Sequence, residues 1–193
     1  MGHPVGVPIA FTLGSLRLVP AVGHLDLLAG PVAALLNTRP DLLDAAAVTE
    51  IDPAVSDTPA LVASHDVPAQ ACANCVVVAG RRDGTERIAG CLVLATTRAD
   101  VNGVVRRLLD VRKASFLPME RAVAEAGMEY GGITPVGLPA GWRLLIDARV
   151  TRTDVVLMGS GVRRSKLLLP GAMLAALPGA EVIEDLALEI PAG

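Results

Sequence analysis

A glycine-rich segment of the chain has the composition of a ligand-binding loop. It reads Tyr130-Gly-Gly-Ile-Thr-Pro135. Gly131 and Gly132 can take backbone angles that other residues avoid and can let a ligand approach the main chain, while Pro135 stiffens the loop. Amides and carbonyls held in this way can orient an ester carbonyl or a ribose hydroxyl. We therefore expect a catalytic or binding role for Gly131, Gly132, Thr134 and Pro135.

Two cysteines, Cys72 and Cys75, stand three positions apart. A Cys-x-x-Cys pair can act as a redox dithiol or as half of a zinc site. However, zinc prefers four ligands, the sequence has no second pair, and Cys91 is isolated. Residues three apart on a strand also point to opposite faces. We therefore expect no metal site and interpret at least one thiol as a buried core residue, and a redox or metal-binding pair is kept as the alternative.

An acidic residue, Asp147, follows the apolar run Leu144-Leu-Ile146. A carboxylate is costly to bury unless it is hydrogen-bonded. Asp147 is therefore either a structural acceptor for loop amides or a group that faces a substrate, and both interpretations stay open.

Two groups of basic residues could contact nucleic-acid phosphates. They are Arg106, Arg107, Arg112 and Lys113, and then Arg163, Arg164 and Lys166. Both groups could equally be the solvated sides of surface elements. The net charge of -3 argues against a protein that wraps nucleic acid mainly through phosphate neutralisation. Any RNA contact is therefore expected to be local, and no DNA partner is expected.

Hydrophobic spacing and turn residues predict an alternation of strands and helices. Strands are expected over 12–19, 45–51, 75–79, 87–96, 142–149, 155–158 and 166–169, and helices over 25–37, 58–65, 118–127 and 171–177. The Asp83-Gly84 pair predicts a tight hairpin, Asp100 a helix cap and Gly127 a left-handed helix end. This order indicates one mixed α+β domain.

The overall composition is consistent with a single domain. A chain of 193 residues can bury one substantial core, and 52% of its residues are apolar. No apolar stretch is long enough to span a bilayer, and the N-terminus lacks the pattern of a secretory signal, so no membrane association and a cytoplasmic location are expected. Residues 1–50 are interpreted as an N-terminal elaboration of the same domain, and residues 51–193 as its main part.

The chain resembles the family of YbaK and prolyl-tRNA-synthetase-associated editing domains. The segment from Gly131 to Pro135 resembles the family's GxxxP loop. Other segments also resemble parts of the family pattern. Lys113-Ala114 and the helix end at Gly127 resemble the part that precedes the loop, and the segment 145–148 resembles a strand that carries an aspartate. Gly159-Ser-Gly161 and the segment 167–170 resemble the family's late glycine pair and its closing strand and helix. The matches keep their order from about Asp57 to about Leu186.

This resemblance implies a mixed curved sheet or barrel flanked by helices. It also implies an aminoacyl-tRNA deacylase that acts in trans, often on tRNA for proline, in which the substrate's ribose hydroxyl and a water do the chemistry without a cofactor. The GxxxP loop would hold the aminoacyl ester and terminal adenosine, and Gly159 and Gly161 would leave room near the 3' end. Lys113, Arg163 and Arg164 would meet phosphates of the tRNA.

One position departs from the family pattern. The resemblance implies a substrate-contacting lysine at Ala73 or Asn74, and Asn74 is the candidate to replace it. The alternative is a catalytically silent module that binds tRNA ends or a small aminoacyl-like ligand. For a deacylase, Gly132→Ala is expected to reduce turnover with little loss of stability. The sequence leaves the oligomeric state open.

Overall fold

The computed structural model describes residues 11–190, in which two five-stranded sheets and a two-stranded ribbon carry the fold. The first sheet is antiparallel, with the order β1 (Phe11–Leu13), β2 (Leu16–Pro20), β3 (Ala47–Glu50), β10 (Ser165–Pro170) and β9 (Val155–Gly159). Strand β3 pairs directly with β10, so the segment before residue 51 shares a sheet with the C-terminal part of the chain.

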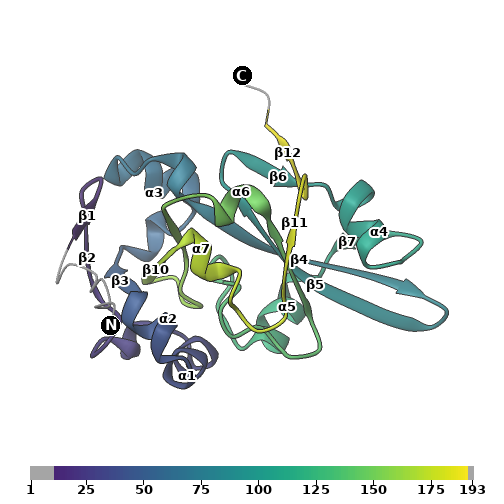
Figure 1. The fold of residues 1–193 in the computed structure, drawn as a ribbon, viewed down its shortest axis with the longest axis horizontal. Helices are drawn as coiled ribbons and strands as arrows, with labels where there is room; N and C mark the ends of the chain where they lie inside the picture. The colour runs from purple at the N-terminus through teal and green to yellow at the C-terminus, as the bar shows by residue number, and fades with distance from the viewer. Residues whose placement is uncertain (1–10, 191–193) are drawn as a thin grey trace, which may run out of the picture.

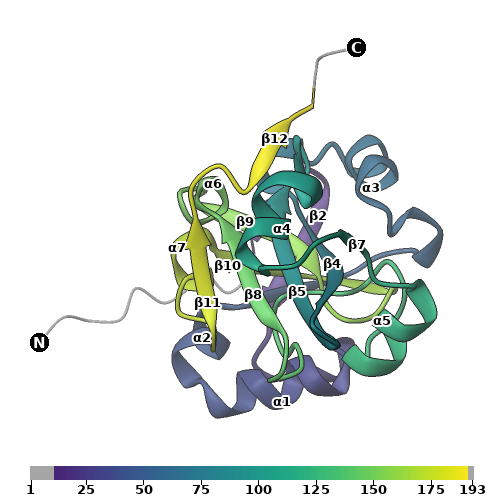
Figure 2. The same ribbon diagram turned by 90° about the vertical axis from the view of Figure 1, so that its right-hand side faces the viewer.

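The second sheet is mixed. Its order is β11 (Ala180–Ile183), β8 (Arg143–Asp147), β5 (Thr85–Leu94), β4 (Ala73–Arg82) and β7 (Ala114–Phe116), as Figure 2 shows. Strand β8 runs parallel to both of its neighbours, whereas the other pairs are antiparallel. The long hairpin of β4 and β5 projects from the rest of the molecule (Figure 1). The ribbon pairs β6 (Thr97–Ala99) with β12 (Ala187–Glu189).

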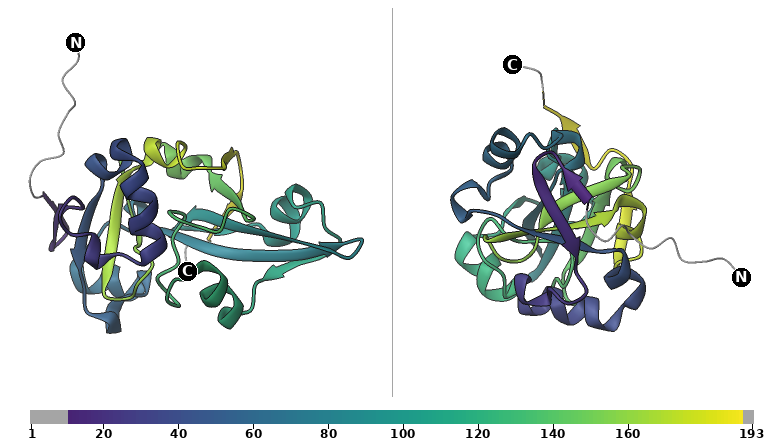
Figure 3. Two further views of the ribbon diagram at one scale, coloured as in Figure 1. Left: turned by 90° about the horizontal axis from the view of Figure 1, so that it is seen from below. Right: turned by 90° about the vertical axis from the view of Figure 1, so that its left-hand side faces the viewer.

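Helices cover both sheets. They are α1 (Gly30–Thr38), α2 (Pro40–Ala45), α3 (Thr58–His65), α4 (Arg106–Leu108), α5 (Met119–Ala126), α6 (Ala148–Thr151) and α7 (Gly171–Leu174), with 3-10 turns at Leu25–Leu27, Pro53–Val55 and Ala69–Ala71 and a π turn at Val101–Val105. Helices α1 and α2 lie beside the first sheet (Figure 3). Val32 and Leu36 of α1 join Leu167 and Ile146 in the largest apolar cluster, which unites the two sheets in one core.

The two sheets meet along one seam, where a parallel bridge joins Cys72 to Leu157 of β9. The predicted mixed α+β domain with a curved sheet and flanking helices is therefore confirmed. None of the helices within residues 11–190 is long and apolar enough to cross a membrane.

Local expectations were met where turn chemistry set the structure. Asp83 and Gly84 both have positive φ between β4 and β5, Asp100 accepts hydrogen bonds from Gly103 and Val104, and Gly127 ends α5 at φ 64°. These hairpin, cap and helix-end predictions are confirmed.

Other boundaries differ from the sequence expectation. The strand expected over 12–19 is a hairpin that turns at Gly14, which has φ 58°. The helix expected over 25–37 begins only at Gly30, because Pro31 occupies the first turn, where its missing N–H costs nothing. The last helix ends at Leu174, and the short strands β6, β7, β11 and β12 were not expected.

Candidate active site

A cavity of about 510 Å³ opens where the two sheets meet. One wall is the start of β4 from Ala73 to Val77, and another is the tip of β7 with the first turns of α5. The segment 56–59, the glycine-rich loop, Gly159 of β9 and Lys166 of β10 complete the lining. Segments as far apart in the sequence as Ser56 and Lys166 therefore build one site.

The cavity contains a buried ammonium group. Lys166 is only 6% exposed, and its Nζ donates a hydrogen bond to the carbonyl oxygen of Ser56 at 2.7 Å. Burial lowers the pKa of Lys166 below its ordinary value, and nearby Cys72 and Asp57 partly oppose this shift. Of the two interpretations left open for the basic cluster, the solvated surface does not fit Lys166. Its signal was a single charge in the apolar strand Ser165-Lys-Leu-Leu-Leu-Pro170.

Strand geometry explains why Lys166 faces the cavity. Alternate residues of β10 point to opposite faces. Leu167 and Leu169 pack into the largest core cluster, whereas Leu168 packs on the other face with Leu61 and Cys72. Lys166 shares the face of Leu168, so its side chain extends toward the segment before α3.

Ser56 contributes a second polar group to the cavity lining. Its side chain is 1% exposed, and its hydroxyl has no hydrogen-bond partner among residues 11–190. A buried hydroxyl without a partner is costly, so this group is suited to receive a ligand. Sequence analysis did not identify Ser56, because an isolated serine carries no pattern.

Apolar side chains stand exposed at the mouth of the cavity. Phe116 is 63% exposed, Tyr130 is 61% exposed and Met119 is 52% exposed, and all three belong to the lining. Aromatic side chains are rare in this chain, at 2% of the residues. Two of them at one opening form a platform on which a planar base can stack.

The glycine-rich loop is paired with the loop after β9. The Gly161 N–H donates to the carbonyl of Gly132 at 2.8 Å, and the Glu129 N–H donates to the carbonyl of Gly161 at 2.8 Å. Space is tight here, because a Cβ on Gly132 would lie 2.9 Å from the backbone of Val162. The expectation that Gly132→Ala leaves stability nearly unchanged therefore does not fit this packing.

The predicted loop residues occupy different environments. Gly131 and Ile133 line the cavity, whereas Thr134 and Pro135 are buried and do not. The Thr134 hydroxyl has no partner among the described residues. In the late glycine pair, Gly159 lines the cavity, while the space beside Gly161 is taken by Ala29, which would lie 2.3 Å from an added Cβ.

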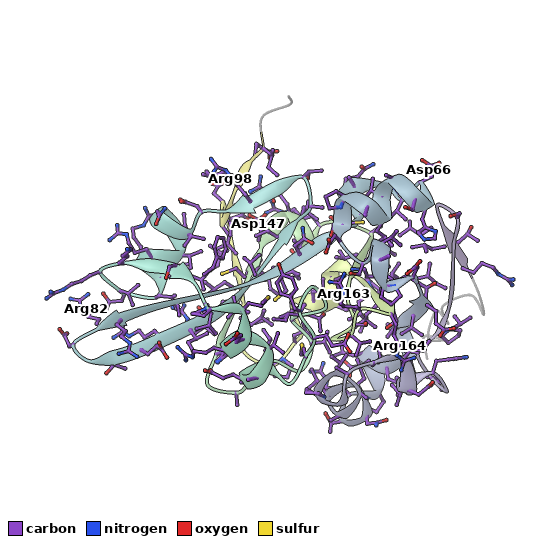
Figure 4. The ribbon with its side chains drawn as sticks, turned by 180° about the vertical axis from the view of Figure 1, so that it is seen from behind. Asp66, Arg82, Arg98, Asp147, Arg163 and Arg164 are labelled. Carbon is purple, nitrogen blue, oxygen red and sulfur yellow. The ribbon has the colours of Figure 1, made fainter. Side chains whose placement is uncertain are left out.

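Arg163 joins the two sides of the cavity. Its guanidinium donates to the carbonyls of Pro53 at 2.9 Å and Tyr130 at 3.3 Å, and lies 4.0 Å from the carboxylate of Asp57. Figure 4 shows Arg163 near the middle of the molecule. Arg163 therefore ties the glycine-rich loop to the segment that carries Ser56.

Asn74 lines the cavity from β4. Its Oδ1 accepts a hydrogen bond from the Thr58 hydroxyl at 2.7 Å. Asn74 also lines an adjoining cavity of about 520 Å³ that contains Arg98 and Asn102. The two cavities share Val76 and Phe116, so they form neighbouring parts of one surface.

Most of the predicted substrate-binding residues lie outside the cavity lining: Gly161 and Arg163, described above, and also Arg164, Lys113 and Asp147. Arg164 donates to the carbonyl of Asp26 at 2.5 Å, and Lys113 is exposed just before β7. Asp147 is 1% exposed and accepts from the Arg149 guanidinium at 2.8 Å and from the Ala187 N–H at 2.9 Å. Asp147 lies toward Arg98 in Figure 4, and its contacts are those of a structural acceptor.

The electrostatics of Asp147 support this assignment. Burial raises its pKa, but hydrogen bonds from the Arg149 side chain and the backbone of Arg149 and Ala187 outweigh burial and leave the pKa below its ordinary value. The carboxylate therefore remains charged and hydrogen-bonded to Arg149 and Ala187.

Cys72 and Cys91 are core residues, whereas Cys75 is half-buried and lines the cavity. All three are free thiols, and burial raises the pKa of Cys72 to about 11 and also raises the pKa values of Cys75 and Cys91. Thiols with raised pKa values are poor nucleophiles at neutral pH. Within residues 11–190, no group of three or more His, Cys, Asp or Glu side chains is placed to hold a metal ion.

Several solved structures share this fold. A candidate trans-editing enzyme for prolyl-tRNA synthetase is 21% identical, with 83% of this chain and 96% of that chain covered and a TM-score of 0.68. A scaffold protein used for epitope backbone grafting is 22% identical, with 84% and 97% covered and a TM-score of 0.69. At these identities the likeness concerns the fold. No curated protein matches the sequence.

The family comparison covers most of the chain. The model of the aminoacyl-tRNA editing domain matches residues 52–177, which include every element that lines the cavity. The chain therefore belongs to the family of aminoacyl-tRNA editing domains.

Proposed function

We propose that this protein hydrolyses the ester bond of mischarged aminoacyl-tRNA in trans, in the cytoplasm, with the cavity between the two sheets as its active site. The observation that carries the proposal is the combination, in one cavity, of buried polar groups at Lys166 and Ser56 with exposed aromatic side chains at its mouth. An aminoacylated adenosine has the complementary arrangement, a polar ester beside a planar base.

The shape of the cavity suits a substrate that enters by its 3' end. In the proposal, the terminal adenine stacks on Phe116 or Tyr130, and the aminoacyl ester extends past Gly131 and Ile133 toward Lys166. The preceding nucleotides would lie over the adjoining cavity, where Arg98 is exposed and forms no ion pair with residues 11–190. An overall negative charge is compatible with such a local contact.

In this proposal the protein acts mainly by positioning the ester and the attacking nucleophile. The lining offers the raised-pKa thiol of Cys75 but no histidine, so a nucleophile activated by histidine does not fit these residues. Attack by a water that the substrate's free ribose hydroxyl orients, with the ester carbonyl held by fixed donors, matches the groups present.

Release of labelled amino acid from a panel of mischarged tRNAs tests the proposal. The panel includes alanyl-tRNA and cysteinyl-tRNA for proline, with correctly charged prolyl-tRNA as the matched control. Many turnovers per protein molecule on at least one mischarged member, with prolyl-tRNA spared, are expected. Stoichiometric binding without turnover on any member would instead identify the catalytically silent module.

A further inference from the structure

We infer that Lys166 is the substrate-contacting ammonium of this site and binds the carbonyl oxygen of the aminoacyl ester. This inference rests on the proposed function and deepens it, because it assigns the charged group that acts on the scissile ester. It also accounts for the asparagine at position 74, since the cavity receives its positive charge from β10 instead of β4.

The first argument concerns hydrogen bonding. An ammonium has three N–H donors, and among residues 11–190 the acceptor for Lys166 is the Ser56 carbonyl alone. No carboxylate of these residues lies within 4.0 Å of its Nζ. A buried charge without an ion pair is costly, and such costs persist in proteins mainly at functional sites. Two donors are thus available to an oxygen ligand in the cavity.

The second argument concerns the neighbouring groups. Ser56 lines the same cavity, and its hydroxyl has no partner among the described residues, so in the inferred complex an oxygen near Lys166 receives donors from both side chains. Two donors that converge on one oxygen are the arrangement that stabilises negative charge developing on an ester carbonyl.

The third argument concerns the orientation of the substrate. Besides Lys166, the charged side chain of the lining is Asp57, which is exposed, and the guanidinium of Arg163 lies 4.0 Å from its carboxylate just outside the lining. An aminoacyl ester carries an ammonium on its α-carbon, which Lys166 repels and Asp57 attracts. The ester carbonyl is therefore the oxygen that can approach Lys166 while the α-ammonium lies toward Asp57.

The chemical step places a defined charge beside Lys166. The oxygen of a water molecule, which the adjacent ribose hydroxyl orients, forms a bond to the carbonyl carbon and gives up a proton to the solvent, while the electron pair of the C=O bond moves onto the carbonyl oxygen. That oxygen accepts hydrogen bonds from Lys166 Nζ, which stays protonated throughout. Collapse of the intermediate returns the pair and breaks the bond to the ribose oxygen, which takes up a proton from the solvent.

Substitution of Lys166, with a charge-restoring second change, tests the inference. Lys166→Met is expected to lower kcat by about 100-fold to 1,000-fold with a smaller change in KM, because the interaction grows in the transition state. Arg17→Met, which removes an exposed positive charge of β2 outside the cavity lining, is the matched control and should keep full kcat. An unchanged kcat for Lys166→Met would overturn the inference.

Asn74→Lys distinguishes the loss of the Lys166 charge from the loss of its side-chain packing. In the wild type it should lower turnover, since two ammonium groups in one cavity repel each other. Together with Lys166→Met it should instead recover at least 10-fold of the lost kcat, because both positions line the cavity. If the kcat losses of the two single variants multiply in the double variant, Lys166 supports the structure of the cavity and does not supply its charge. Should Lys166→Met fail to fold, Asn74→Lys alone decides, and wild-type turnover in that variant would contradict the inference.

The failure of the inference is distinguishable from failure of the proposed function. Wild-type protein inactive on every tRNA of the panel contradicts the proposed function. Wild-type turnover that Lys166→Met leaves intact contradicts the inference alone. A hydrolysis-resistant adenosine with a 3'-alanylamide gives an independent readout by calorimetry: it should bind wild type at least 10-fold more tightly than Lys166→Met, and equal affinities would reject the assigned contact.

Discussion

The N–H of Gly161 donates a hydrogen bond to the carbonyl of Gly132 at 2.8 Å, and this contact joins the two glycine loops of the site. One loop precedes β8 in the sequence and the other follows it, yet in the folded protein their backbones are close enough to exclude a side chain at Gly132. The glycine at this position is therefore required by packing between loops as well as by access for a ligand.

Gly132→Ala is accordingly expected to lose stability and activity together. The added methyl group would meet the backbone of Val162 at 2.9 Å, so the loops must separate, at a cost of about 1–3 kcal/mol. Urea unfolding of the variant checks the size of the loss. Gly141→Ala is the control, because an added Cβ there has no neighbour within 4 Å, and equal stability of the two variants would contradict the packing argument.

Phe116→Ala tests the base-stacking platform. The side chain is largely exposed, so folding should be unaffected, while loss of stacking of about 1–3 kcal/mol predicts a KM raised roughly 5-fold to 150-fold. Steady-state kinetics on the mischarged tRNA measures the change. Val182→Ala removes an exposed apolar side chain of β11 away from the cavity, and a similar rise in KM there would argue against a specific platform.

Arg98→Ala tests the path of the tRNA strand. If Arg98 contacts a phosphate, its removal should weaken tRNA binding and reduce the slope of log K against log salt by about 1. Binding is measured between low and moderate salt, with Arg17→Ala as the control, since Arg17 is exposed on β2 away from both cavities. An unchanged slope for Arg98→Ala would place the strand elsewhere.

Asp147→Asn separates the structural role of this carboxylate from a role in substrate binding. The variant loses the charge-assisted contacts with Arg149, which predicts a loss of roughly 1–3 kcal/mol at neutral pH with unchanged kcat/KM. The folded-state pKa of Asp147 is lowered, so its contribution is fully present above the ordinary pKa of 3.8 and is lost as the pH falls through the folded-state value.

Denaturant unfolding at pH 7 and at pH 2 to 3 checks both parts of this prediction. The stability gap between wild type and Asp147→Asn should narrow in acid. Glu189→Gln is the control, because Glu189 contacts the same arginine but is mostly exposed, so its loss should be about 0.5 kcal/mol or less. Reduced kcat/KM in a fully folded Asp147→Asn protein would restore the substrate-binding hypothesis.

Sequence reasoning succeeded where neighbouring residues determine the structure. The left-handed end of α5 at Gly127 and the hairpin turn at Asp83 and Gly84 follow from residues a few positions apart. Parallel pairing of β11 with β8 depends on contacts across more than thirty residues, and no local pattern announces it.

The candidate site also contains residues that the local sequence could indicate and residues that only the fold brings together. The glycines at 131 and 159 could be placed near a ligand because glycine marks close approach of the backbone. The contact between Lys166 and Ser56 could not be predicted in this way, because it forms only when the fold brings together two residues that are 110 positions apart. The remaining signal was one lysine in an apolar strand, and it resembled a surface cluster because two arginines precede it.

The pH dependence of stability provides a test of Lys166 that needs no substrate. Because burial lowers its folded-state pKa, the protonated side chain costs stability at neutral pH, and wild type should gain stability relative to Lys166→Met as the pH rises toward 10.5. The charge of Lys166 acts to lower the pKa of the neighbouring Cys72 thiol, so the comparison is made in a Cys72→Ala background, with Asp57 and Arg163 present in both proteins. Unfolding in urea from pH 7 to pH 10 measures it, and Lys113→Met should show a constant difference from wild type. A constant difference for Lys166→Met as well would mean that its ammonium is not desolvated in the folded protein, and the cavity would then lack the buried charge that the inference requires.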